Sequence, residues 1–170
     1  SEAFLDRVSR LYASDEQLDG LWTQALETRA MAGDETMRNL RDAGANGALA
    51  ARLMQEADGA QIAMIELSGW DSHAGQPGQF RRQARGLDAL LGAFKTGMGP
   101  VWDQTLVIVA TEFGRTAALN GTNGTDHGTA GAAIIMGGRV NGGKVVADWP
   151  GLGESDLYEG RDLKPTIALE

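Results

Sequence analysis

The chain has 170 residues, of which 42% are apolar and 22% are charged, so it has enough apolar side chains for the core of one domain. Its net charge of −8 argues against nucleic acid or an anionic membrane as a partner, because binding to phosphate groups requires clustered Lys and Arg. It has no cysteine, which excludes disulfides, zinc–thiolate sites and cysteine nucleophiles. No apolar run approaches the roughly 18 residues of a membrane-spanning helix, and no signal peptide is recognisable.

Residues 1–58 are predicted to form a helical segment. Ser14 followed by Gln17 is typical of a capping box at the start of a helix. Apolar residues then recur at helical spacing and predict one buried face: Leu18, Leu21, Trp22, Ala25 and Leu26. Gly33 and Asp34 indicate a break, after which a second helix is expected to end near Gly59.

Three short apolar runs follow, at residues 62–67, 105–110 and 132–136, and each predicts a buried strand. An amphipathic helix is predicted between the first two runs, with apolar positions from Phe80 to Phe94. A strand, a helix and a further strand in succession predict a right-handed crossover and parallel strands. Residues 60–168 therefore predict an α/β domain with a mainly parallel sheet.

Polar clusters lie next to the three predicted strands: GWDSH at 69–73, EFGRT at 112–116 and GTDHG at 124–128. In an open parallel sheet, ligands bind beyond the carboxyl ends of the strands. Both histidines of the chain, His73 and His127, belong to these clusters, and each has an aspartate nearby. Imidazole nitrogen and carboxylate oxygen suit zinc, manganese or iron. The clusters therefore predict one site for a divalent metal, with zinc or manganese expected first and calcium or magnesium as alternatives.

The same residues also have structural interpretations that the sequence leaves open. Aspartate often satisfies backbone N–H groups in loops, where histidine simply faces water. Arg115 is either a clamp for an anion or the partner of a carboxylate or a helix end. Glu66, inside an apolar run, either faces solvent or is held by a cation, because an unpaired buried carboxylate is costly.

The three motifs, in this order, resemble those of the bacterial domain-of-unknown-function family numbered 1501, over about residues 60–165. Members of that family often carry twin-arginine export signals, so the resemblance implies a periplasmic or exported parent protein. The family is similar to the superfamily of alkaline phosphatases and sulfatases, which implies a three-layer α/β fold. On this interpretation the chain is a fragment that lacks the first strands. Independently of the resemblance, the final pair Leu169-Glu170 is expected to be a cloning remnant.

The resemblance also implies which residues bind metal: Asp71, His73, Glu112, Asp126 and His127. One ion would be held by Asp71, His73 and His127. A second ion would have Glu112 and Asp126. Phe113 stands where the superfamily has a further metal-binding histidine, and a phenyl ring cannot bind metal.

The resemblance implies that the parent protein hydrolyses phosphate or sulfate esters, with a small anionic ester as its partner. A divalent metal would polarise the ester oxygen, and Arg115 is the expected catalytic residue as a clamp on the anion. The hydroxyl nucleophile of the superfamily is expected before Ser1, so we expect this chain to be inactive by itself. The alternative is a non-catalytic exported scaffold or binding protein with one structural cation, which Phe113 favours.

Overall fold

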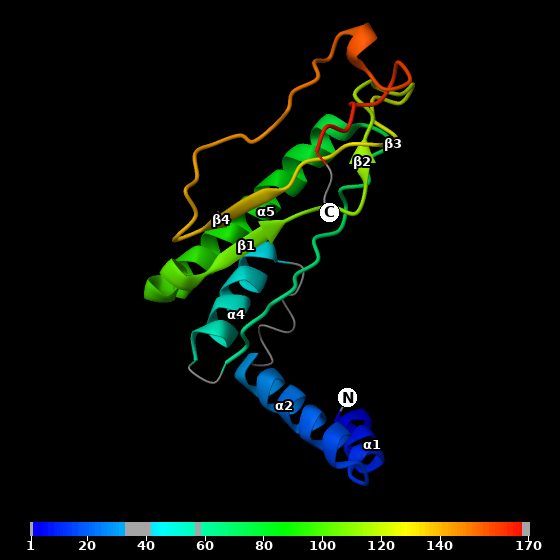
Figure 1. The fold of residues 1–170 in the computed structure, drawn as a ribbon. Coiled ribbons are helices and arrows are strands. Elements are labelled where there is room, and N and C mark those ends of the chain that lie inside the picture. The colour runs from blue at the N-terminus through cyan, green and yellow to red at the C-terminus, as the bar shows by residue number, and fades with distance from the viewer. Residues whose placement is uncertain (1, 33–41, 57–58, 168–170) are drawn as a thin grey trace. The chain divides into compact units, whose positions relative to one another are not determined.

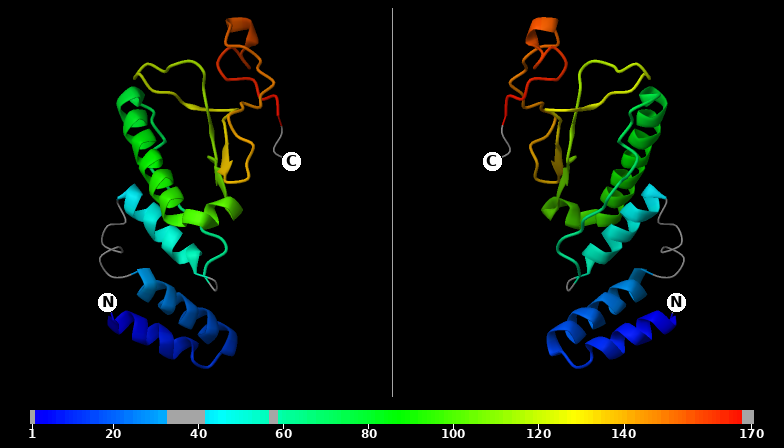
Figure 2. Two further views of the ribbon diagram at one scale, coloured as in Figure 1. Left: turned by 90° about the vertical axis from the view of Figure 1, so that its left-hand side faces the viewer. Right: turned by 90° about the vertical axis from the view of Figure 1, so that its right-hand side faces the viewer.

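The computed structural model describes residues 2–32, 42–56 and 59–167 (Figures 1 and 2). It divides into two compact units. The first unit comprises residues 1–64 and 90–97, and the second comprises residues 65–89 and 98–170. None of the helices in the described part of the chain combines the length and the apolar character needed to cross a membrane. The predicted break at Gly33 and Asp34 and the expected remnant at 169–170 lie outside the described residues.

The first unit begins with two helices, α1 (Glu2–Tyr12) and α2 (Glu16–Ala32). The Asp15 carboxylate accepts hydrogen bonds of 3.1 Å from the backbone N–H groups of Gln17 and Leu18, and so caps the start of α2. The predicted capping box starting at Ser14 is therefore wrong by one residue. The predicted buried face of this helix is also partly wrong, because the side chains of Leu18 and Leu21 are exposed.

The next helix, α4 (Ala43–Gln55), packs against the last turns of α5 (Gln76–Met98) through small residues. A Cβ atom on Gly47 would lie 2.1 Å from the backbone oxygen of Leu90, so only glycine allows this approach of the two backbones. Ala51 is completely buried. The apolar core of the first unit therefore lies at this contact: Ala50, Ala51, Leu90 and Phe94.

The second unit contains the first turns of α5 and two short antiparallel strand pairs. β1 (Leu106–Val109) pairs with β4 (Ile134–Gly137), and β2 (Gly114–Arg115) pairs with β3 (His127–Gly128). Two short 3-10 helices complete the unit, η1 (Gly99–Gln104) before β1 and η2 (Glu154–Asp156) in the C-terminal segment. The strands predicted at 105–110 and 132–136 are confirmed in position by β1 and β4.

The predicted three-layer fold with a mainly parallel sheet is wrong. The structure is 46% helix and 10% strand, and both strand pairs among the described residues are antiparallel. The parallel arrangement required residues 62–67 as a strand beside β1, but this segment forms no strand, and Ile62 and Met64 are 88% and 97% exposed. The chain instead returns from β1 to β4 through a loop, and an antiparallel pair needs no helical crossover.

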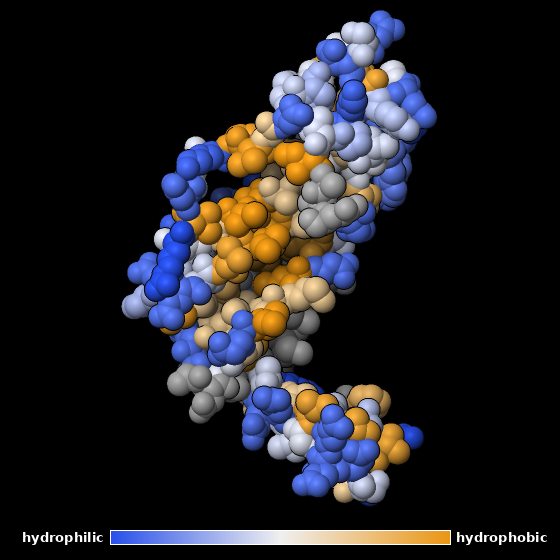
Figure 3. All heavy atoms as spheres, in the orientation of Figure 1, coloured by the Kyte–Doolittle hydropathy of each residue, from blue (hydrophilic) through white to orange (hydrophobic). Residues whose placement is uncertain are grey.

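The ribbon formed by β1 and β4 exposes one apolar face. Ile108 pairs with Ile135, so these two residues lie on the same face as Leu106, and all three are about 60% exposed. Figure 3 shows apolar side chains gathered on this surface. The prediction of a buried strand was therefore right about the strand and wrong about its burial on this face.

The close approach of α4 and α5 can be tested with a matched pair of glycine substitutions. Gly47→Ala should lower the free energy of unfolding by about 1–3 kcal/mol, because the new methyl group would overlap the Leu90 backbone. Gly92→Ala, at a helical position with open space around the Cβ, should raise it by about 0.5–1 kcal/mol. Urea denaturation followed by circular dichroism measures both effects. Stabilisation by both substitutions would contradict the tight contact at Gly47.

Candidate metal centre

The three polar clusters meet although the sheet is not parallel. Val109 at the end of β1 pairs with Ile134 at the start of β4, so the chain leaves and re-enters the ribbon at the same end. The second and third clusters lie between these two points, and β2 and β3 pair them directly, with Arg115 opposite His127. The antiparallel pairing of β1 with β4 therefore brings the second and third clusters together. The sequence interpretation had attributed this convergence to parallel strands.

Asp71, His73 and His127 form a group that could hold a metal ion. Each offers one ligand atom, and these atoms all lie within 4.8 Å of one another. The Nε2 atoms of His73 and His127 are both 2.9 Å from Oδ1 of Asp71. All three side chains are about half exposed, so an ion could reach them from solvent. One carboxylate oxygen and two imidazole nitrogens suit zinc and related divalent ions.

Asp126 lies at the other ring nitrogen of His73. Its Oδ1 atom is 3.0 Å from His73 Nδ1, and Asn120 Nδ2 donates a hydrogen bond of 3.1 Å to the same oxygen. A carboxylate on Nδ1 fixes the orientation of the imidazole ring and leaves Nε2 for a metal ion. Asp126 thus contacts the ring nitrogen of His73 that faces away from the triad. The sequence interpretation had assigned Asp126 to a second ion instead.

Arg115 connects the first and third clusters. Its Nη2 donates to Oδ1 of Asp71 at 2.6 Å and to the backbone oxygen of Trp70 at 2.9 Å, and its Nη1 donates to the backbone oxygen of Thr125 at 2.7 Å. The side chain is only 19% exposed. Of the interpretations that the sequence left open, this geometry corresponds to pairing with a carboxylate. The role of Arg115 as a clamp for a substrate anion stays a prediction.

Phe113 and Glu112 occupy different surroundings. The Phe113 ring stacks on the His127 ring with a centroid distance of 4.5 Å and an interplanar angle of 5°, and so fixes the plane of that imidazole. Arg115 covers the same phenyl ring, with its guanidinium carbon 4.7 Å from the centroid. Glu112 is exposed and lies outside the group of possible ligands. The structure therefore brings Asp71, His73 and His127 together without Glu112.

Asn120 is a part of the site that sequence reasoning missed. Besides contacting Asp126, its amide donates to the backbone oxygen of His73 at 2.9 Å, and its Oδ1 accepts from the backbone N–H groups of Thr122 and Gly124, both at 3.0 Å. The run of residues 120–124, Asn-Gly-Thr-Asn-Gly, leads into the third motif, and such turn-forming residues could have identified Asn120.

Gly124 is required for space rather than for an unusual backbone angle. A Cβ atom there would lie 2.2 Å from the backbone carbon and oxygen of His73. The loop before the third motif can therefore lie directly against the segment that carries the first histidine.

Hydrogen bonds lower the pKa values of both aspartates in the centre. For Asp71 the largest cause is the hydrogen bond from His127, and Arg115 adds to it, whereas desolvation acts in the opposite direction. For Asp126 the hydrogen bond from His73 comes first and that from Asn120 second. Because the pKa values are lowered, these contacts stabilise the folded site fully at pH values above 3.8, the ordinary pKa of aspartate. That stabilisation is lost as the pH falls through the lowered pKa.

Removal of one imidazole should change the pKa of one of the two aspartates and leave the pKa of the other low. In His127→Ala the pKa of Asp71 should rise toward 3.8, because the largest cause of its lowering is gone. The pKa of Asp126 should stay low, since His73 and Asn120 still contact it. Carbon-detected NMR of the aspartate carboxyl groups across the acidic range measures both values in the metal-free protein. An unchanged Asp71 pKa would show that its contact with His127 does not form in solution.

The family model described as "Protein of unknown function (DUF1501)" matches residues 3–170. No curated protein and no solved structure matches the chain. The match includes the N-terminal helices as well as the three motifs whose side chains meet at the candidate metal centre. Because it covers nearly all of the sequence, the chain belongs to the DUF1501 family.

Proposed function

We propose that Asp71, His73 and His127 bind one divalent metal ion, zinc or manganese, in a centre for the hydrolysis of phosphate or sulfate esters. The observation that supports this proposal most directly is the convergence of three ligand atoms within 4.8 Å. Three protein ligands leave a coordination position for water or for a substrate oxygen, as catalytic zinc sites do. When bound, the ion would polarise the ester oxygen and stabilise the charge that develops on it.

The surrounding residues prepare the ligands for this task. Asp126 holds His73 by Nδ1 at 3.0 Å, so that Nε2 remains for the ion. Phe113 and Arg115 hold His127 and Asp71, the first by ring stacking and the second by a hydrogen bond of 2.6 Å. The centre therefore requires little rearrangement of its ligands when an ion enters.

The reaction class is supported by the motifs rather than by the sheet. GWDSH, EFGRT and GTDHG occur in an order similar to that of the metal-binding segments in alkaline phosphatases and sulfatases. This similarity supports a small anionic ester as the substrate and an exported location for the parent protein. Asp71, His73 and His127 are the ligands that the similarity assigns to a single ion, and they are the residues that converge.

A structural cation in a non-catalytic protein is the second candidate function. Phe113, at the place of a further metal-binding histidine in the superfamily, stacks on His127 instead. Glu112 lies outside the triad, and both terminal nitrogens of Arg115 donate to protein oxygens. A scaffold or binding protein with one cation needs no more than this arrangement, so the two candidates differ in whether the ion accepts a substrate anion.

Calorimetric titration with zinc or manganese tests the triad. We expect one ion per chain with a dissociation constant in the micromolar range or weaker, and a rise in melting temperature, because the ion prefers the folded state. His73→Ala and His127→Ala should each abolish the binding heat, and Asp126→Asn should weaken binding about 10–100-fold by releasing His73. Glu112→Gln is the matched control and should bind like the unaltered protein. Equal affinities in all variants would show that the triad binds no ion.

The open coordination position can be tested with inorganic phosphate. Saturating metal should raise the affinity for phosphate at least about tenfold in the unaltered protein, and His127→Ala should remove this gain.

The two readouts distinguish the candidates. Metal binding without any gain in phosphate affinity would favour the structural cation over the hydrolytic centre. Metal-dependent release of nitrophenol from nitrophenyl phosphate that disappears in His127→Ala would support the hydrolytic centre directly.

A further inference from the structure

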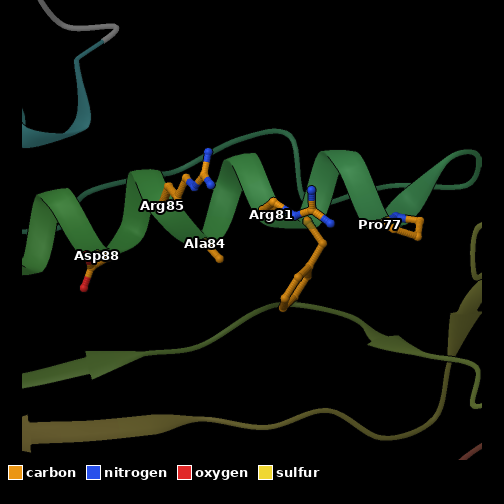
Figure 4. A pocket seen from close by; sticks show the side chains of 6 residues that line it. Pro77, Arg81, Ala84, Arg85 and Asp88 are labelled. Atoms are coloured by element: carbon orange, nitrogen blue, oxygen red, sulfur yellow. The ribbon is translucent and has the colours of Figure 1, made fainter.

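A cavity that is open to solvent runs along α5, which follows the first motif in the chain. Its volume is about 560 Å³, and it lies within the second unit. The lining residues all belong to α5: Pro77, Phe80, Arg81, Ala84, Arg85 and Asp88. Figure 4 shows Pro77 at one end of the row and Asp88 at the other, and Pro77 is only four residues beyond His73.

Two arginines make the cavity suitable for an anion. Arg81 and Arg85 are four residues apart and therefore adjacent on one face of the helix. Neither takes part in an ion pair within the described part of the chain, although the chain as a whole has a net charge of −8. Guanidinium groups bind sulfate, sulfonate and phosphate oxygens through charge-assisted hydrogen bonds. Asp88, three residues after Arg85, is the one carboxylate among the lining residues.

An aromatic surface connects the cavity to the metal centre. The Phe80 ring lines the cavity, is 55% exposed and packs edge-on against the Trp70 ring with a centroid distance of 5.8 Å. Trp70 directly precedes Asp71, and its backbone oxygen accepts a hydrogen bond from Arg115. A ligand that extends from the triad to the arginines would therefore pass over apolar ring surface.

Helix α5 also fixes the distance between the loop of the metal centre and the two arginines. The start of α5 is attached to the loop of the metal centre, since the backbone N–H of Gln76 donates to the backbone oxygen of Asn123 at 2.9 Å. With a rise of about 1.5 Å per residue, Arg81 and Arg85 lie roughly 8 and 14 Å along the axis from that start. A rigid helix of this kind selects ligands by length as well as by charge.

We propose that this cavity is a subsite for a second anionic group, so that the preferred esters carry their ester group and a further negative charge at opposite ends of a ring-containing body. The binding of the ester group at the metal centre rests on the proposed function. The binding of the second anionic group at the arginines, called the anion end below, can be tested by itself. Asp88 at the far end of the cavity repels anions and so limits how far the second charge extends.

The anion end is tested in the metal-free protein with toluenesulfonate, and with uncharged toluenesulfonamide as the matched ligand. NMR titration should show toluenesulfonate shifting the amide signals of the cavity residues, with weaker or no binding of the amide analogue. Arg81→Ala combined with Arg85→Ala should weaken binding about tenfold or more, and Asp88→Asn should tighten it. Arg82→Ala removes a neighbouring arginine that does not line the cavity and should change affinity less than about twofold. Equal losses in the Arg82 variant and the double variant would overturn the subsite.

The connection between the two ends is tested in the metal-loaded protein with sulfonaphthyl phosphate and naphthyl phosphate. The arginine double variant should lose affinity for the first ligand and keep its affinity for the second. Equal losses for both ligands would overturn the assignment to the second anionic group. Failure of the metal centre alone would appear differently: metal would then have no effect on either phosphate, while the toluenesulfonate results remained as expected.

Discussion

The Oδ1 atom of Asp71 is the common partner of three nitrogen atoms, Nε2 of His73, Nε2 of His127 and Nη2 of Arg115, at 2.6–2.9 Å. The four residues come from the segment before α5 and from the paired strands β2 and β3. Without this carboxylate, a guanidinium and two basic rings would face one another with no opposite charge between them. This oxygen atom therefore joins the four side chains of the centre, and it is also the oxygen that a divalent ion would take over.

Around this atom the second unit is organised by polar contacts more than by an apolar core. Ser72, Thr116 and Thr125, one from each motif, are buried, and the backbone N–H of Thr116 donates to the backbone oxygen of Asp126 at 3.0 Å. The C-terminal segment adds to this framework, because Thr116 forms a bridge with the buried Asp162. Hydrogen bonds are directional, so such a framework positions ligands well even where little apolar surface is covered.

The geometry supports one ion rather than two. Asp126 is engaged with the ring nitrogen of His73 that points away from the triad contact, and Glu112 stands apart from the group. The stacked Phe113 ring covers one face of His127. A single ion with three ligands still accepts an oxyanion, and α5, which carries the arginine-lined cavity, begins three residues after His73. The proposed subsite and the proposed centre thus describe one elongated surface for an anionic ligand.

The sequence by itself determined the features that depend on neighbouring residues. Apolar runs located β1, β4 and α5, and the two histidines with their aspartates identified the residues that meet. It did not determine strand direction, because Ile62 and its neighbours have the composition of a buried strand but remain exposed. It also did not determine which carboxylate contacts which imidazole, since Asp126 and His73 are 53 residues apart. Only the tertiary structure decided these points, because pairing direction and long-range contacts depend on which segments lie side by side and not on local composition.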